Sequence, residues 1–186
     1  QKETFQFRIA HGESHRLKKP LDLAPWKKTL RAAINTLTQV IEKFPAAPEV
    51  ADAWYSRGKA HNELEEFSMA ERDFLHFVTH HAEHPNVDSA WMALAEIATS
   101  ANDPARAAKC LHEVEKHPDS PHYPFALHKL GWAYYNLSDV TRAVGYLERH
   151  VRYYQNRMKD PNSSSGPSDG ALIETTLFDI ALFYLD

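Results

Sequence analysis

The chain repeats one residue pattern with a period in the mid-thirties. A bulky residue, a small residue, an alanine and a large apolar residue recur in the same order, at intervals of 37 and then 36 residues. The three blocks are Trp54, Gly58, Ala70 and Phe74; Trp91, Ala95, Ala107 and Leu111; and Leu127, Gly131, Ala143 and Leu147. Such a period is typical of stacked helical hairpins, because one hairpin cannot bury its apolar face alone and needs its neighbours. The sequence therefore predicts an all-α fold, a right-handed α-solenoid of stacked antiparallel helix hairpins.

Helical periodicity and helix-stopping residues place the individual helices. Apolar residues at spacings of three and four mark an amphipathic helix that begins near Trp26, and Pro45 ends it. Asp103 and Asp139 are expected N-cap residues, and Pro104 is expected at the first helical position. The expected helices cover residues 26–44, 49–64, 67–83, 87–101, 104–117, 121–137 and 139–158.

The two ends of the chain depart from the regular pattern. Residues 1–25 are predicted to form an N-terminal arm or a degenerate first helix, and residues 26–158 the repeats. The segment 159–170 is rich in Pro, Gly, Ser and Asn, so a flexible loop is expected there. Residues 171–186 are predicted as the first helix of a further, incomplete repeat, because they follow the order of Leu127, Leu130, Gly131 and Tyr134. The equivalent residues are Leu177, Ile180, Ala181 and Tyr184.

The repeated residues resemble the tetratricopeptide repeat (TPR) family. The pattern of this family places a bulky residue, Leu-Gly, Tyr, Ala, an aromatic residue, Ala and Pro across about 34 positions. Arg57 and His61 depart from the pattern, since Leu and Tyr are usual there. The resemblance covers about residues 26–158 and 171–186 and implies a TPR-like superhelix. The best match is formed by Leu127, Leu130, Gly131, Tyr134, Ala143 and Leu147.

The link at residues 118–121, Pro-Asp-Ser-Pro, carries a second resemblance. It is similar to the links of bacterial cell-envelope TPR proteins, such as the lipoprotein subunit of the outer-membrane β-barrel assembly machinery and the Tol–Pal coordinator protein. This resemblance implies a periplasmic or outer-membrane-associated location, with a cytoplasmic location as the alternative.

Helical phase predicts which side chains line the concave side of the array. The first helices of stacked hairpins line that side, and residues opposite the buried stripe face it. Rigid aromatic side chains bury area at low entropic cost and dominate binding hot spots, so the aromatic members are the strongest candidates. The alternative is that some of them pack on neighbouring helices or on the loop 159–170. The expected groove residues are Tyr55, Lys59, Asn62, Met92, Glu96, Phe125, His128, Trp132 and Tyr135.

Three of the twelve histidines, His76, His80 and His84, are spaced to share one helix face. Two histidines at i and i+4 can bind one metal ion, so this face is a weak candidate for a metal site. However, no carboxylate or cysteine lies at ligand spacing on it, and no His-Glu-x-x-His motif occurs. A structural role near a helix C-terminus is therefore the main interpretation, and no metal or other cofactor is predicted.

Composition narrows the class of function. The net charge is −4 and no long basic tract occurs, which argues against a nucleic-acid partner. No apolar run approaches the roughly 18 residues of a membrane span, so no membrane insertion by this segment is expected. The single Cys110 excludes an internal disulfide and is expected to be a small buried residue. No nucleophile elbow, phosphate loop or dinucleotide motif occurs, so an enzyme is not expected.

Three functions follow from these patterns, in decreasing order of support. The first is a non-enzymatic scaffold or adaptor that binds a peptide or partner protein in the concave groove, as part of a bacterial cell-envelope assembly. The second is a structural or oligomerising spacer of a larger complex. It would act through the C-terminal edge, with Phe178 and Leu182 as contact residues, because repeat arrays need a polar cap that this edge lacks. The third is metal binding by the histidine face.

Overall fold

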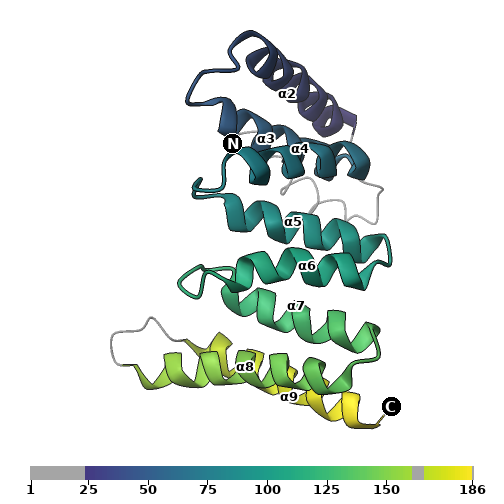
Figure 1. The fold of residues 1–186 in the computed structure, drawn as a ribbon, viewed down its shortest axis with the longest axis vertical. Helices are drawn as coiled ribbons and strands as arrows, with labels where there is room; N and C mark the ends of the chain where they lie inside the picture. Colours follow the sequence, from purple (N-terminus) through teal and green to yellow (C-terminus); the bar gives the residue numbers. More distant parts are fainter. Residues whose placement is uncertain (1–23, 161–165, 186) are drawn as a thin grey trace, which may run out of the picture. The chain divides into compact units, whose positions relative to one another are not determined.

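The computed structural model describes residues 24–160 and 166–185, and these residues form eight α-helices and no strand (Figure 1). They belong to two compact units, residues 1–81 and residues 82–186. The first unit contains α2 (Ala24–Lys43), α3 (Val50–Glu63) and α4 (Phe67–His80). Within each unit, helices that are consecutive in the chain pack on one another, which confirms the all-α helical repeat fold. The second unit contains α5 (Val87–Ser100), α6 (Pro104–Glu115), α7 (Tyr123–Asn136), α8 (Val140–Lys159) and α9 (Pro167–Leu185).

The same tight turn closes the hairpins α3–α4, α5–α6 and α7–α8. One residue of each link lies in the left-handed region, which residues other than glycine rarely adopt: Glu65 has φ 60°, Asn102 φ 56° and Ser138 φ 61°. The N–H of the following residue then donates to a carbonyl in the last turn of the first helix, as in a Schellman motif. These bonds, each 2.9 Å long, join Glu66 to His61, Asp103 to Ala98 and Asp139 to Tyr134. The sequence period is therefore repeated in the backbone conformation.

Both predicted N-caps are confirmed. The carboxylate of Asp103 accepts a 2.9 Å hydrogen bond from the N–H of Arg106, and Pro104 begins α6. The carboxylate of Asp139 accepts a bond of the same length from the N–H of Arg142. This backbone hydrogen bond is the main reason why the pKa of Asp139 lies below its usual value.

Two helix boundaries differ from the prediction by three residues or more, and the others differ by two residues at most. Helix α4 ends at His80, before residue 83, because the N–H of His81 closes the last turn on the carbonyl of Phe77. Helix α9 begins at Pro167, four residues before the predicted start, so the predicted loop is shorter. Proline suits the first helical turn, where its missing N–H is not needed. Residues 161–165 of that loop and residues 1–23 of the N-terminal arm lie outside the described residues.

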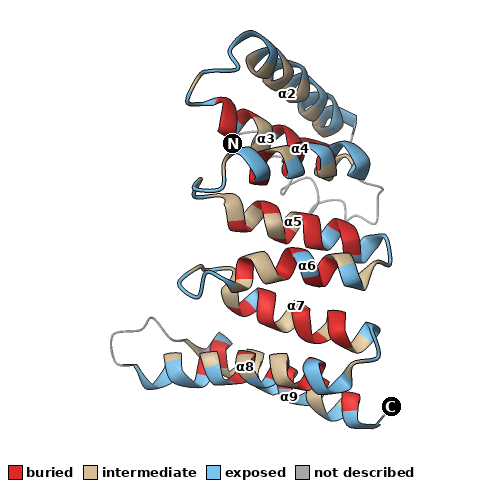
Figure 2. Ribbon diagram, in the orientation of Figure 1, coloured by how far each residue is buried: buried red, intermediate tan, exposed pale blue. Residues whose placement is uncertain are grey.

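Small residues allow the two helices of a hairpin to approach closely. A Cβ atom added to Gly131 would lie 2.5 Å from Cδ2 of Leu147, and one added to Gly58 would lie 2.9 Å from Cε1 of Phe74. Leu147 and Phe74 are themselves buried, at 0% and 1% exposure. Figure 2 shows buried residues along the helices from α3 to α8. The predicted role of these small residues in close helix packing is confirmed.

Replacing Gly131 by alanine is expected to lower the free energy of unfolding by about 1–3 kcal/mol, because the added methyl group overpacks the core against Leu147. Gly145→Ala is the matched control, since a Cβ there would meet nothing within 4 Å. We expect this control to stabilise α8 by about 0.5–1 kcal/mol through helix propensity. Urea denaturation followed by circular dichroism measures both changes. A Gly131→Ala midpoint at or above that of the wild type would contradict the packing argument.

The first unit contains a buried ion pair at the first departure from the family pattern. Arg57 of α3 and Asp73 of α4 are only 5% and 0% exposed. The guanidinium of Arg57 donates through Nε to Oδ2 of Asp73 at 2.6 Å and through Nη2 to Oδ1 at 2.8 Å. Its Nη1 also donates to the hydroxyl of Thr38 on α2, at 3.0 Å. Arg57 therefore connects all three helices of the unit.

The second departure, His61, extends the same network. Its Nδ1 lies 2.7 Å from a carboxylate oxygen of Glu66, and Arg31 of α2 reaches the other oxygen of Glu66 at 3.0 Å. The hydrogen bond with His61 is the largest cause that holds the pKa of Glu66 below its usual value. Both departures from the family pattern thus take part in one polar network within residues 24–81.

Helix α9 is attached to α8 by a buried polar contact. The hydroxyl of Thr176 donates to the carbonyl of Leu172 at 2.8 Å, so it must accept the 3.0 Å hydrogen bond from Nδ1 of His150. Both side chains are almost fully buried, at 1% and 2% exposure. Burial, together with the nearby His128, lowers the pKa of His150 to about 4. The imidazole of His150 is therefore neutral at pH 7, with its proton on Nδ1.

Candidate functional site

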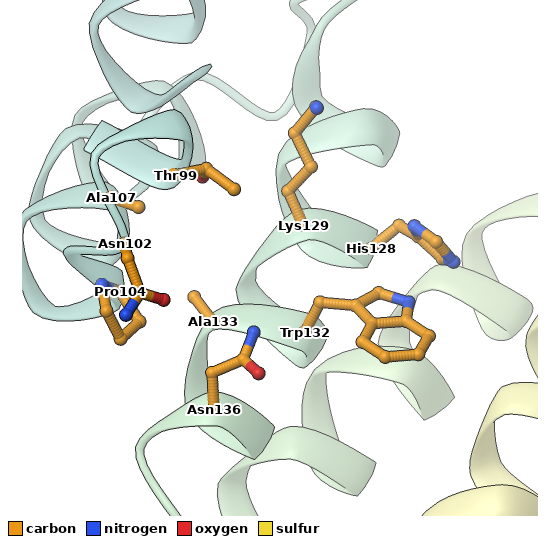
Figure 3. A pocket seen from close by; sticks show the side chains of 9 residues that line it. All are labelled: Thr99, Asn102, Pro104, Ala107, His128, Lys129, Trp132, Ala133 and Asn136. Atoms are coloured by element: carbon orange, nitrogen blue, oxygen red, sulfur yellow. The ribbon is translucent and has the colours of Figure 1, made fainter. Parts of the chain in front are cut away.

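A pocket of about 290 Å³ opens in the second unit, between α5, α6 and α7 (Figure 3). Two of the predicted groove residues, His128 and Trp132, take part in its wall. The other wall comes from the α5–α6 hairpin. The lining residues are Thr99, Asn102, Pro104, Ala107, His128, Lys129, Trp132, Ala133 and Asn136.

The polar groups of the pocket can both donate and accept hydrogen bonds. Figure 3 shows the exposed carboxamides of Asn102 and Asn136 on opposite sides of the pocket. The left-handed turn at Asn102 sets the position of its side chain. Thr99 donates its hydroxyl proton to the carbonyl of Ala95 at 2.9 Å, which leaves the oxygen as an acceptor. A carboxamide offers one acceptor and two donors, so the pair matches the N–H and C=O groups of an extended peptide.

The charges at the rim of the pocket are paired. Nζ of Lys129 lies 3.2 Å from a carboxylate oxygen of Glu96, and both side chains are about half exposed. Glu96 therefore lies at the surface, but it forms an ion pair with Lys129 of α7, the first helix of the next hairpin. Because the two charges offset each other, the rim favours a neutral polar ligand over a strongly charged one.

Trp132 and His128 are positioned by a residue of α9. The indole N–H of Trp132 donates to Oδ2 of Asp179 at 3.3 Å, and Nε2 of His128 lies 2.9 Å from the same oxygen. Asp179 is buried, at 8% exposure. Figure 3 shows both rings directed away from Thr99 and Asn102. The pocket is therefore lined by the parts of these side chains nearest the backbone, whereas the ring nitrogens contact Asp179 of α9.

Two of the aromatic residues predicted for the groove, Trp132 and Tyr135, are covered by an aromatic residue that was not predicted there. Phe183 of α9 stacks on Tyr135, with ring centroids 4.0 Å apart and planes 7° apart. It also meets Trp132 edge-on at 5.0 Å, and Trp132 meets Tyr135 edge-on at 5.9 Å. Phe183 is 2% exposed. The alternative that some groove aromatics pack on a neighbouring helix therefore applies to Tyr135 and to the indole of Trp132.

Two other groove residues of the second unit lie outside the pocket. Met92 is only 8% exposed and belongs to the core, so the expectation that it faces a groove is wrong. Its unbranched, flexible side chain can fill an irregular space in the core. Phe125 is 50% exposed at the start of α7 but does not line the pocket. At the C-terminal edge, Phe178 is 70% exposed and Leu182 is half-buried.

The groove residues predicted in the first unit belong to a separate surface. The ring of Tyr55 packs on its own hairpin, with centroids 5.3 Å from Phe77 and 6.1 Å from Phe74. Lys59 is exposed and places its Nζ 5.6 Å from the centroid of Tyr55, a cation–π contact. Asn62 is half-buried on the same helix. Tyr55 therefore serves the packing of α3 on α4 as well as the surface.

The three histidines do not share one helix face, and this prediction is wrong. Helix α4 ends at His80, so His84 lies beyond it and accepts a hydrogen bond from the N–H of Asn86 at 3.2 Å. The ring of His76 stacks between Trp54, at 3.8 Å, and His80, at 4.2 Å. Burial is the main reason why the pKa of His76 is lowered. Among residues 24–160 and 166–185, no group of three or more His, Cys, Asp or Glu is arranged to hold a metal ion.

The residues of this site that sequence reasoning missed include Asn102, Asn136, Asp179 and Phe183. Asn102 lies in a hairpin link, so helical phase within the first helices did not identify it. Asn136 is the last residue of α7 and lies one turn after Trp132, so helical phase could have identified it, but the predicted groove residues ended at Tyr135. Asp179 carried a signal, because it is a single charged residue in an apolar stretch and lies one helical turn before Phe183. Cys110, by contrast, is buried at 8% exposure, as predicted.

The stacked hairpins and the pocket on them define a helical repeat protein of the scaffold class. More particularly, the chain belongs to the tetratricopeptide repeat family, whose model matches residues 30–76 and 92–161. Repeats of this family are generally non-enzymatic scaffolds for protein–protein interaction. None of the curated protein sequences matches this chain.

Solved structures confirm the fold. A crystal structure of the MamA protein is 17% identical, with a TM-score of 0.62 over 74% of this chain and 70% of that chain. A putative kinesin light chain from Podosopora anserina with nearly identical TPR-like repeats is 17% identical, with a TM-score of 0.61 over 97% and 85% of the two chains. The Sgt2 TPR domain from Aspergillus fumigatus is 20% identical, with a TM-score of 0.51 over 73% and 81%.

Within the part of the chain that the structure describes, none of the helices combines the length and the apolar character that a bilayer crossing requires.

Proposed function

We propose that the chain is an adaptor that binds a short extended segment of a partner protein in the pocket between α5, α6 and α7. The observation that carries this proposal is the pair of exposed carboxamides, Asn102 and Asn136, on opposite sides of a pocket of about 290 Å³. Carboxamides so arranged can pair with the backbone of an extended peptide whatever its sequence. The base of Trp132 supplies an apolar wall for one side chain of the ligand.

The rest of the pocket favours a neutral ligand. Lys129, a charged residue that lines the pocket, is paired with Glu96, and the ring tip of His128 is bound by the buried Asp179. A partner segment with a neutral polar backbone stretch and one apolar side chain therefore fits best. A cell-envelope setting stays a prediction that the link at residues 118–121 suggests.

The double variant Thr99→Ala/Asn136→Ala tests the pocket, since both residues are exposed and line it. Peptides are first selected against the wild-type chain from a random-peptide display library, and their Kd values are measured by fluorescence polarisation. We expect the double variant to bind them at least tenfold more weakly, which is about 1.4 kcal/mol. Ser100→Ala/Lys109→Ala is the control, because both residues are exposed outside the pocket and should leave Kd unchanged. Equal affinity of the pocket variant and the wild type would refute the assignment.

A second candidate function is that of an oligomerising spacer acting through the C-terminal edge. It is favoured by one observation, the exposure of Phe178 (70%) and Leu185 (83%) on α9. Sedimentation velocity of the wild type and of Phe178→Asp distinguishes this function, because only a spacer of this kind would self-associate in a Phe178-dependent way.

A further inference from the structure

Two histidines of α4, His76 and His80, lie one helical turn apart with their rings nearly parallel. The ring centroids are 4.2 Å apart and the ring planes differ by 20°. Residues four apart in an α-helix are neighbours on one side of it, so both rings leave the helix in the same direction. His84 lies beyond the end of α4 and does not belong to this pair. We call His76 and His80 the α4 histidine pair.

The tautomer of His80 is set by the backbone of the previous turn. Its Nδ1 lies 2.9 Å from the carbonyl oxygen of His76. A carbonyl oxygen can only accept a hydrogen bond, so Nδ1 of His80 carries the proton and Nε2 carries a lone pair. Histidines that bind a metal ion commonly donate their other ring N–H in this way, which fixes the tautomer and orients the ring. His80 is exposed, so a metal ion can reach this lone pair.

His76 is held in place by an aromatic contact. Its ring stacks on the indole of Trp54, with centroids 3.8 Å apart and planes 19° apart. Its Nδ1 is buried, which leaves Nε2 as the ring nitrogen that a metal ion can reach. Burial is the main cause that lowers the pKa of His76, so a proton competes less for this nitrogen at pH 7. His76 is therefore a preorganised ligand, whose ring loses little freedom on binding.

The surroundings of the α4 histidine pair favour a cation. Helix α4 ends at His80, and a helix C-terminus carries a partial negative charge. Arg57 and Asp73 also act on His76. These two residues form the buried ion pair described above, so their charges offset each other and the preference set by the helix end remains.

The number and type of ligands indicate which metal ion fits. A closed structural zinc site has four protein ligands, and the part of the chain that the structure describes offers no group of three or more His, Cys, Asp or Glu that could hold a metal ion. Copper(II) binds nitrogen ligands more tightly than the other divalent first-row metals and adopts a tetragonal geometry, in which a chelate occupies two adjacent positions. Adjacent nitrogens at metal–nitrogen distances of about 2.0 Å lie about 2.8 Å apart. Rotation of the exposed His80 ring can bring the two Nε2 atoms to this separation.

We propose that the α4 histidine pair binds one copper(II) ion through the two Nε2 atoms, with water at the remaining positions. Copper binding is separate from peptide binding in the pocket between α5, α6 and α7, so the proposal does not depend on that pocket. It also differs from the three-histidine face expected from the sequence, because His84 takes no part.

The probe is copper(II) sulfate, titrated into the whole chain in a buffer that does not bind copper. Tryptophan fluorescence measures binding, because bound copper quenches the nearby Trp54, whose indole stacks on His76. We expect His80→Gln and His76→Gln to weaken copper binding about tenfold or more, since the second imidazole of a chelate binds intramolecularly. His84→Gln is the matched control and is expected to leave the affinity unchanged. Electron paramagnetic resonance with equimolar copper should show two coordinated imidazole nitrogens in the wild type and one in His80→Gln.

Three outcomes would overturn the proposal. Equal copper affinity in the wild type and in His80→Gln, which changes an exposed side chain, would show adventitious binding at other histidines of the chain. A wild-type spectrum with a single coordinated nitrogen would exclude a chelate. Weakening in His84→Gln as large as in His80→Gln would assign the site to all three histidines. Circular dichroism of each variant verifies its helical content, so that loss of binding is not confused with unfolding.

Discussion

Replacing Asp73 by alanine is expected to lower the free energy of unfolding of the α2–α4 unit by about 3–5 kcal/mol. The carboxylate is fully buried and accepts two hydrogen bonds from Arg57, at 2.6 and 2.8 Å. Without it, the guanidinium of Arg57 stays 5% exposed with no carboxylate beside it. An unpaired charge at such a position costs much more than the net value of the pair.

The equivalent positions in the other repeats suggest a compensating change. Position 57 corresponds to Leu94 and Leu130, and position 73 corresponds to Cys110 and Tyr146. We expect the double variant Arg57→Leu/Asp73→Ala to recover most of the loss, because it removes both charges together and restores the leucine used elsewhere in the array. Leu94 and Leu130 are buried at 3% and 0% exposure, which shows that the site accepts this side chain.

Hydrogen exchange measured by mass spectrometry on α3 and α4 tests this prediction, because it reports the opening of this unit by itself. Exchange is expected to be fast in Asp73→Ala and near the wild-type rate in the double variant. Arg72→Ala is the control, since Arg72 is exposed and only approaches Asp73 at 3.4 Å. Equal exchange rates in Asp73→Ala and the wild type would contradict the prediction. So would a double variant less stable than either single variant.

Acidification is expected to destabilise the α5–α9 unit through His150. The pKa of this buried imidazole is about 4, against 6.5 for an ordinary histidine. Between these two pH values His150 binds a proton in the unfolded chain but not in the folded unit. The contribution of His150 to the free energy of unfolding is therefore fully present above pH 6.5 and decreases as the pH falls toward 4. The lost stability reaches about 3 kcal/mol at pH 4. The groups that face His150 are His128 of α7, Asp179 of α9 and Tyr154 of α8.

The variant His150→Val isolates this effect. Valine stands at the equivalent position 114, where it is fully buried, and Thr176 keeps its hydrogen bond to the carbonyl of Leu172. Urea denaturation at several pH values between 4 and 7.5 gives the free energy of unfolding of both proteins. We expect the stability of the wild type relative to the variant to decrease as the pH is lowered from 6.5 to 4. A difference that stays constant over this range would rule out His150 as the cause, because this residue is the titratable group that the variant lacks.

Much of the fold follows from local signals. The positions of the helices, the caps at Asp103 and Asp139, and the close packing at Gly58 and Gly131 were all predictable, because periodicity, capping and residue size act over a few residues. The pocket was only partly predictable. His128 and Trp132 were identified by helical phase, whereas Asn102 lies in a link, where phase carries no information. Asn136 lies one turn after Trp132 on the same face of α7, so phase could have identified it as well.

The role of the aromatic groove residues required knowledge of contacts far apart in the sequence. Whether Trp132 and Tyr135 are available to a ligand depends on Phe183 and Asp179, which lie about 50 residues later in the chain. Met92 was likewise assigned to the groove by phase, but neighbouring helices bury it. Helical phase predicts the side of a helix on which a residue lies. Only the packing of neighbouring helices determines what covers that side.

The repeat period of 37 and then 36 residues determined from the sequence alone that the chain builds helical hairpins and belongs to a class of interaction scaffolds. That information is local and periodic, since each hairpin forms from adjacent residues. Tertiary structure alone decided what the predicted groove residues contact: a pocket opens beside Trp132 and Asn136, whereas Phe183 of α9 stacks on Tyr135. Exposure depends on which helix packs against which, so two aromatic residues of α7 have different surroundings: Phe125 is 50% exposed, whereas Phe183 of α9 stacks on Tyr135.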